Sequence, residues 1–129
     1  MNVLIDTQSF IWFIEDDTKL PAKIKDFMNS EDNVLLLSIA SLWEITIKVS
    51  IGKLKMQKNF DDLIKDISKD GFEIFPIKPK HLLSLSKLEY INDHKDPFDR
   101  VIISQSISEN IPVISSDGNF KKYPVKIIW

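Results

Sequence analysis

The chain begins MNVLIDTQSFIW (residues 1–12), and this stretch decides how the rest of the sequence is interpreted. The apolar run VLI (3–5) stops at a carboxylate, Asp6, which is followed by Thr7 and a second apolar run. Short, continuously apolar runs are typical of strands buried on both faces of a parallel sheet. Burying an unpaired carboxylate is costly, so Asp6 is expected to have a partner, to line an open cleft or to bind a metal ion.

Similar short runs recur along the chain and predict a central sheet of about five strands. The predicted strands are residues 2–5, 34–37, 72–77, 112–115 and 125–129. Segments with helical spacing or capping residues lie between them, at 8–14, 21–30, 60–70, 80–88 and 97–109. Strands that alternate with helices predict a parallel sheet covered on both faces, a three-layer α/β/α sandwich. No repeat or linker interrupts the pattern, so we expect one domain over residues 1–129.

The segment SIASLWEITIKVSIGK (38–53) fits two structures. Apolar and polar residues alternate from Trp43 to Ile51, which predicts a strand with Glu44 facing solvent. Against this, Ser38 directly after a strand is a good helix N-cap, and Gly52 is a good helix stop. The residue pattern alone slightly favours the strand.

Composition limits the chemistry that the chain can carry out. With 43% hydrophobic and 28% charged residues, it has the make-up of an ordinary globular protein. It contains no cysteine, which excludes disulfides, thiol nucleophiles and Cys-ligated zinc. Its two histidines, His81 and His94, do not have the spacing of a zinc pair, and His94 is predicted to be a polar loop residue. No leader and no run of about 18 apolar residues stands out, so we expect a cytoplasmic protein without membrane contact.

The net charge of −2 argues weakly against a nucleic-acid partner. There are 17 basic and 19 acidic side chains, however, so four acids gathered in one metal site would leave a slightly basic remainder. Lys48, Lys53 and Lys55 could then form a track for phosphate groups.

Acidic residues follow strands that the topology should bring together. Asp6 ends the first predicted strand and Asp117 the fourth, and ligands of parallel sheets bind beyond the carboxyl ends of the strands. Taken on its own, each residue is more simply interpreted as a helix cap after a strand. In HKDPFDR (94–100), Asp96 is predicted to cap the helix that Pro97 begins. Asp99 lies at the third helical position, where capping explains it less well because Asp is shorter than the Glu or Gln of a capping box.

Taken together, LIDTQSFIW, SLWEI, HKDPFDRVIISQ and ISSDGNFKKYPVKIIW resemble PIN domains, in particular the VapC-type toxins of toxin–antitoxin pairs. The resemblance extends over the whole chain, and its most specific parts are the DPFDR block and the closing segment. It implies a PIN-like fold, a metal-dependent endoribonuclease acting on RNA, a cognate VapB-like antitoxin and a homodimer. Trp12 could lie in the dimer interface or in an antitoxin groove.

The resemblance also implies which residues form the active site. The catalytic and metal-binding residues would be four acids, Asp6, Glu44, Asp99 and Asp117, supported through hydrogen bonds by Thr7 and Ser115. Similar proteins carry the residue matching Glu44 on a helix, and we follow the resemblance there. Independently of it, four carboxylates without cysteine or histidine form a hard-oxygen site, which Mg²⁺ or Mn²⁺ prefers over zinc. Arg100 could contact substrate phosphate or form a surface ion pair.

Three other classes fit the sequence less well. A receiver module needs an acidic pair after its first strand and a lysine after its last, whereas Asp6 is single and the sequence stops at Trp129. A HAD-type phosphatase would need a second aspartate where Gln8 stands. A degenerate PIN scaffold that binds without cleaving is the stronger alternative, although such scaffolds commonly lose acids and this chain has all four.

Overall fold

The computed structural model describes all 129 residues and contains a five-stranded parallel sheet. The strands are β1 (Asn2–Ile5), β2 (Val34–Ser38), β3 (Phe72–Phe75), β4 (Val113–Ile114) and β5 (Ile127–Ile128). Their order across the sheet is β3-β2-β1-β4-β5, and every neighbouring pair is parallel. The predicted α/β sandwich with a central parallel sheet is therefore confirmed.

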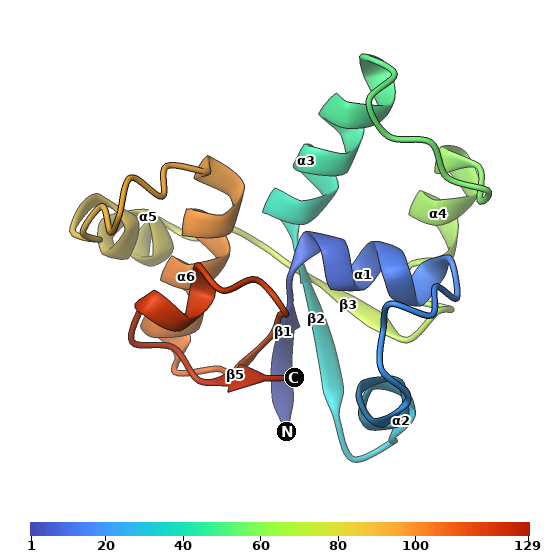
Figure 1. Ribbon diagram of the computed structural model, residues 1–129, viewed down its shortest axis with the longest axis horizontal. Coiled ribbons are helices and arrows are strands. Elements are labelled where there is room, and N and C mark those ends of the chain that lie inside the picture. The colour runs from blue at the N-terminus through green and yellow to red at the C-terminus, as the bar shows by residue number, and fades with distance from the viewer.

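Helices cover both faces of this sheet (Figure 1). The helices are α1 (Thr7–Ile14), α2 (Ala22–Asn29), α3 (Ile39–Ser50), α4 (Phe60–Asp66), α5 (Pro79–Ser86) and α6 (Pro97–Glu109), with a short 3₁₀ turn, η1 (Phe120–Lys122). Helices α1, α2 and α4 lie on one side, α5 and α6 on the other, and α3 rises from the carboxyl end of β2. None of these helices is long and apolar enough to cross a membrane.

The apolar runs are buried because alternate side chains of each strand enter different cores. Val3 and Ile5 pack with α1, α2 and α4, whereas Leu4 between them packs with α6 and η1. Leu36 of β2 likewise lies in the second core, between two neighbours that lie in the first. A strand with helices on both faces has no solvent-facing side, and this explains the absence of polar alternation.

Residues 39–50 form a helix, so the strand favoured by local alternation is wrong and the helix preferred from the resemblance is confirmed. The Ser38 side chain caps it by accepting a hydrogen bond from the Ala40 amide at 3.1 Å. On the helix, Ala40 and Ile45 are fully buried, and Glu44 turns inward with only 7% of its surface exposed. Two-residue alternation over so short a segment does not exclude a helix, and the cap and the tertiary contacts decide the structure.

Most other boundaries differ from the prediction by a few residues. Strand β3 stops at Phe75 because Pro76 has no N–H to donate to a neighbouring strand. Helix α6 begins at Pro97 and ends at Glu109, as predicted. Asn110, in the left-handed conformation with φ of 54°, ends this helix and turns the chain toward β4.

Candidate acidic site

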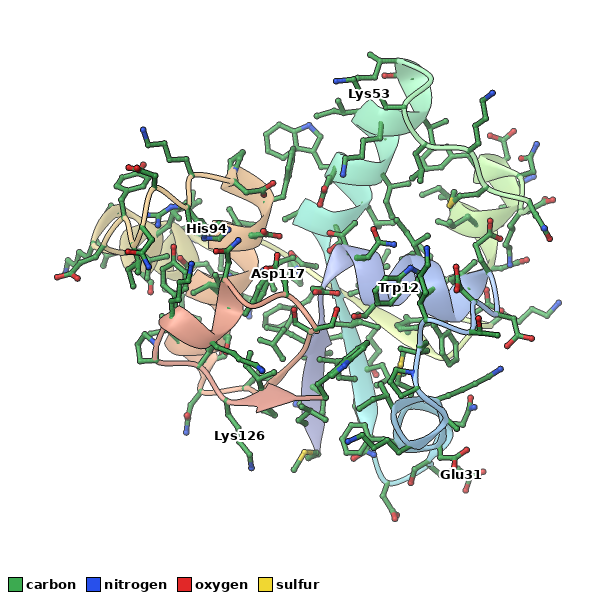
Figure 2. The ribbon with its side chains drawn as sticks, viewed as in Figure 1. Trp12, Glu31, Lys53, His94, Asp117 and Lys126 are labelled. Atoms are coloured by element: carbon green, nitrogen blue, oxygen red, sulfur yellow. The ribbon has the colours of Figure 1, made fainter.

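An acidic cavity of about 280 Å³ opens beyond the carboxyl ends of β1 and β4. These two strands are neighbours in the sheet. From β1 the chain continues to β2 on one side, and from β4 it continues to β5 on the other side. The cavity therefore lies at a topological switch point, where parallel sheets bind ligands. Asp117 lies near the centre of the molecule, between α6 and the start of α1 (Figure 2). The cavity lining includes all four predicted acids, Asp6, Glu44, Asp99 and Asp117.

Asp6 both caps α1 and lines the cavity, so the two interpretations of this residue do not exclude each other. Its Oδ1 accepts a hydrogen bond from the Ser9 amide at 2.7 Å, and its Oδ2 accepts one from Ser115 Oγ at 2.5 Å. Burial raises the pKa of the Asp6 carboxyl, these hydrogen bonds oppose the rise, and the charge of Asp117 adds to it. Thr7 contributes differently from Ser115, because its hydroxyl donates to Ser41 Oγ at 2.9 Å and ties α1 to α3.

Asp99 occupies the first turn of α6, behind its cap. The Asp96 side chain accepts a hydrogen bond from the Asp99 amide at 2.9 Å, which confirms Asp96 as the N-cap. Asp99 Oδ2 lies 3.1 Å from His94 Nε2. Burial raises the pKa of the Asp99 carboxyl to about 7, the negative charges of Asp96, Asp117 and Glu44 add to the rise, and the His94 hydrogen bond opposes it.

Glu44 enters the cavity from α3 with one oxygen paired and one unpaired. Its Oε2 forms an ion pair with Lys48 at 2.7 Å, whereas its buried Oε1 has no hydrogen-bond partner. Asp117 Oδ1 accepts a hydrogen bond from the Asn119 amide at 2.9 Å, so a local turn holds this carboxylate at the end of β4. The four acids thus reach one cavity from four separate segments of the chain.

The chemistry of this cavity fits a hard divalent cation. Burial and the neighbouring carboxylates raise the pKa of Asp99, and the buried Glu44 Oε1 has no hydrogen-bond partner; a cation would relieve both costs. As they stand, no three carboxylate or imidazole side chains are grouped as ligands of one ion. Hydrogen bonds and one ion pair engage Asp6, Glu44, Asp99 and Asp117 individually. Binding of one ion by three of them would require their side chains to move closer together, with Glu44 released from Lys48 if it is one of the three.

Two residues beside the site differ from their predicted roles. Arg100 is neither a phosphate ligand nor part of a surface ion pair: it is 3% exposed and donates to the carbonyls of Leu88 and Glu89 at 2.8 and 2.9 Å. His94 does lie in a loop, but it is buried and contacts Asp99. Its proximity in sequence to the capped start of α6, two residues before Asp96, was the available signal.

Of the other residues singled out in the sequence, Lys48 lines the acidic cavity, whereas Trp12, Lys53 and Lys55 lie outside it. Trp12 is half-buried and packs against Trp129, with ring centroids 6.1 Å apart. Lys53 and Lys55 are exposed near the end of α3, and a phosphate track along them stays a prediction.

A parallel α/β fold with acids gathered at its carboxyl edge defines the class, and a comparison with protein families identifies the family. The PIN domain family matches residues 3–126, so the chain belongs to the PIN domain family, as the sequence motifs predicted. No curated protein sequence matches the chain.

Solved structures share the fold at low sequence identity. A chain of Rickettsia felis VapBC2 bound to a promoter DNA fragment superposes with a TM-score of 0.74 at 20% identity, covering 99% of this chain and 98% of that one. A chain of DNA-bound VapBC from Salmonella typhimurium gives 0.71 at 15% identity, covering 99% and 97%. For VapBC-1 from nontypeable Haemophilus influenzae the TM-score is 0.68 at 17% identity, covering 99% and 97%.

Proposed function

We propose that this protein is a metal-dependent endoribonuclease and the toxin component of a toxin–antitoxin pair. The observation that carries the proposal is the convergence of Asp6, Glu44, Asp99 and Asp117 on one cavity at the sheet edge, with a buried oxygen of Glu44 unpaired. The PIN domain family match and the similarity to VapBC structures support it.

The charge of the cavity explains why a cation would be needed. Five carboxylates line it, those of Asp96 and the four predicted acids, against the single ammonium group of Lys48. An RNA phosphate would be repelled from this surface unless a cation first compensates the negative charge. We therefore assign Mg²⁺ or Mn²⁺ to the four acids, whose oxygens are the ligands that these ions prefer.

A bound divalent ion supplies an activated water and stabilises the charge that develops on the phosphate and the leaving oxygen. The protein residues hold the acids in place for this chemistry. Ser115 fixes Asp6, and Asp96 fixes the first turn of α6 and therefore the position of Asp99. Lys48 is the basic side chain within the cavity, and on release from Glu44 its ammonium group would be available to a phosphate oxygen.

We further propose that a VapB-like antitoxin binds this protein and that the toxin is a homodimer. The similarity to structures described as VapBC complexes supports the first partner. Exposed apolar side chains support the second: Ile39, Trp43, Ile47 and Ile51 recur every fourth residue along α3 and its C-terminal end and are 37–59% exposed. Such a stripe is typical of a helix that packs on a partner.

The proposed activity is tested by incubating the purified protein with mixed cellular RNA, with Mg²⁺ or Mn²⁺ and with excess chelator. We expect cleavage with metal and none with chelator, because without a cation the carboxylates of the cavity repel the RNA phosphate and nothing compensates the charge that develops on the leaving oxygen. Full cleavage in excess chelator would contradict the metal mechanism. RNA binding without cleavage under every metal condition would favour the degenerate scaffold.

A further inference from the structure

A chain of polar side chains runs behind the acidic cavity, and the proposed function does not use it. Its members are Arg100, Tyr123 and His94, which are 3%, 4% and 7% exposed. Arg100 Nη1 lies 3.2 Å from Tyr123 Oη, and Tyr123 Oη lies 2.9 Å from His94 Nδ1. His94 Nε2 then lies 3.1 Å from Asp99 Oδ2, so the chain ends on a carboxylate of the cavity. His94 lies in the loop that precedes α6 (Figure 2).

The chemistry of Arg100 sets the direction of these hydrogen bonds. A guanidinium group only donates, so the Tyr123 oxygen accepts from Arg100. The single hydroxyl proton of the buried Tyr123 must then point to another acceptor, and His94 Nδ1 is the group within reach. Because Nδ1 accepts, the proton of the neutral imidazole is on Nε2. His94 Nε2–H therefore donates to Asp99 Oδ2.

We propose that His94 is a positioning residue for Asp99, held in the Nε2–H tautomer by Tyr123 and Arg100. The imidazole fixes Oδ2 of Asp99, which leaves Oδ1 for the cation of the acidic cavity; in its metal-related part, this inference rests on the proposed function. Carboxylate ligands in metalloproteins commonly have such supporting hydrogen bonds, which orient the ligand before the ion binds.

The same residues anchor the loop that carries His94. Arg100 donates to the carbonyls of Leu88 and Glu89, and its guanidinium carbon lies 3.9 Å from the centroid of the Tyr90 ring. The loop is thus tied to α6 next to Asp99. A purely structural role would end there, and His94 would then affect stability without affecting the metal site.

A second buried histidine provides a matched control. His81 Nδ1 accepts a hydrogen bond from the Lys78 amide at 2.9 Å, and its Nε2 lies 2.9 Å from Glu109 Oε1. This pair also joins an imidazole Nε2 to a carboxylate oxygen, but it lies at the other end of α6, outside the acidic cavity. Substituting His81 reports the cost of losing a buried histidine without touching the metal site.

The first measurement is the tautomer of His94, obtained from the ¹⁵N chemical shifts of its imidazole in the metal-free protein at neutral pH. We expect Nε2–H in the wild type and a mixture of tautomers in Tyr123→Phe, which keeps the ring and removes the hydroxyl donor. An Nδ1–H tautomer or a doubly protonated ring in the wild type would overturn the inference. This readout needs neither metal nor RNA.

The second measurement is Mn²⁺ affinity by calorimetry for wild type, His94→Leu, His94→Gln and His81→Leu. The Gln amide can donate to Asp99 from nearly the position of imidazole Nε2. We expect about 10-fold or greater weakening in His94→Leu, and His94→Gln within about threefold of wild type. His81→Leu should bind Mn²⁺ like the wild type.

The outcomes separate this inference from the proposed function. If wild type and His94→Leu bind Mn²⁺ equally, the inference is wrong and the proposed function stands. If the wild type binds no Mn²⁺ and cleaves no RNA, the proposed function is wrong, and the metal-related part of the inference falls with it. Should His94→Leu fail to fold, Tyr123→Phe decides the matter, because unchanged affinity in that folded variant together with an unchanged tautomer would overturn the inference.

Discussion

Helix α6 carries a carboxylate–histidine pair at each end, and their surroundings shift the pKa values of the two carboxyl groups in opposite directions. Asp99 at the N-terminal end contacts His94, and Glu109 at the C-terminal end contacts His81. Their side chains are 20% and 21% exposed. Burial within the acidic cavity raises the pKa of Asp99 to about 7, whereas hydrogen bonds from Lys80 and His81 lower the pKa of Glu109 to about 2.

The field of the helix itself would produce the reverse. A helix favours negative charge at its N-terminus and disfavours it at its C-terminus, by roughly 0.3–1 kcal/mol. The rise in the pKa of Asp99 from its ordinary 3.8 corresponds to roughly 4 kcal/mol against its charged form. Desolvation and neighbouring acids therefore outweigh the helix dipole. The N-terminal end of α6 faces an excess of negative charge, which a cation would compensate, whereas Glu109 at the C-terminal end already has a cationic partner in Lys80.

The largest expected effect follows from neutralising each carboxylate in turn. Asp99→Asn should lower RNA cleavage by more than the roughly 10–100-fold that loss of a supporting residue costs, because an amide is a poor ligand for a hard cation. Its metal-free melting temperature should stay unchanged or rise slightly, since the substitution relieves repulsion in the cavity. Glu109→Gln should leave cleavage unchanged. Cleavage assays at one fixed Mg²⁺ concentration, with thermal melting, measure both quantities.

Asp96→Ala is the control at the same end of the helix. It removes the cap of α6, so it should lower the free energy of unfolding by about 1 kcal/mol while leaving substantial cleavage. A stable but inactive Asp96→Ala beside an active, destabilised Asp99→Asn would reverse our assignment of the two aspartates.

A smaller effect is expected when metal is added to the folded protein. Divalent ions should raise the melting temperature of the wild type and of Glu109→Gln, because a ligand of the folded state adds about 2.7 kcal/mol at 100 times its Kd. Asp6→Asn should respond much less, since it lacks one of the proposed ligands. Differential scanning fluorimetry with Mg²⁺ and with Mn²⁺ measures the shifts. Equal shifts in all three proteins would locate the metal outside the acidic cavity.

Some features of the fold and of the acidic cavity could be predicted from the sequence. Strand β1 and helix α6 were predicted with the observed boundaries, because a fully buried apolar run and a capped Pro97 are local patterns. The grouping of Asp6 and Asp117 followed from a general property of parallel sheets, whereas the resemblance added Asp99, and the structure brings all three to one cavity. Glu44 required the resemblance, because local alternation predicted it on a strand facing solvent.

The partners of these acids could not be predicted, because they depend on tertiary contacts. Tyr123 is 29 residues from His94 in the sequence, and nothing local indicates that its hydroxyl faces the imidazole. Arg100, next to Asp99, was expected to contact phosphate or to form a surface ion pair, yet its side chain turns toward the 88–90 loop. The helical periodicity of α6 separates these adjacent side chains, and only the packing of the loop shows where each one points.

The smallest expected effect concerns the ion pair of Glu109 with Lys80 at the C-terminal end of α6. The pKa of Glu109 is lowered from its ordinary 4.5 to about 2 in the folded state. Its ion pair therefore stabilises the fold fully above pH 4.5 and loses this contribution as the pH falls toward 2.

Relative to wild type, Glu109→Gln should unfold about 1 kcal/mol or less more easily at neutral pH, since Lys80 is an exposed partner and Gln still accepts from His81. Urea unfolding of both proteins from pH 7 to pH 3 should show this difference constant above pH 5 and shrinking below pH 4.5. Glu31→Gln, which alters an exposed glutamate without an ion pair, should track the wild type throughout. A difference between wild type and Glu109→Gln that instead grew as the pH fell would mean that the folded state binds more protons at this end of the helix, and the contrast between the two ends of α6 would then be wrong.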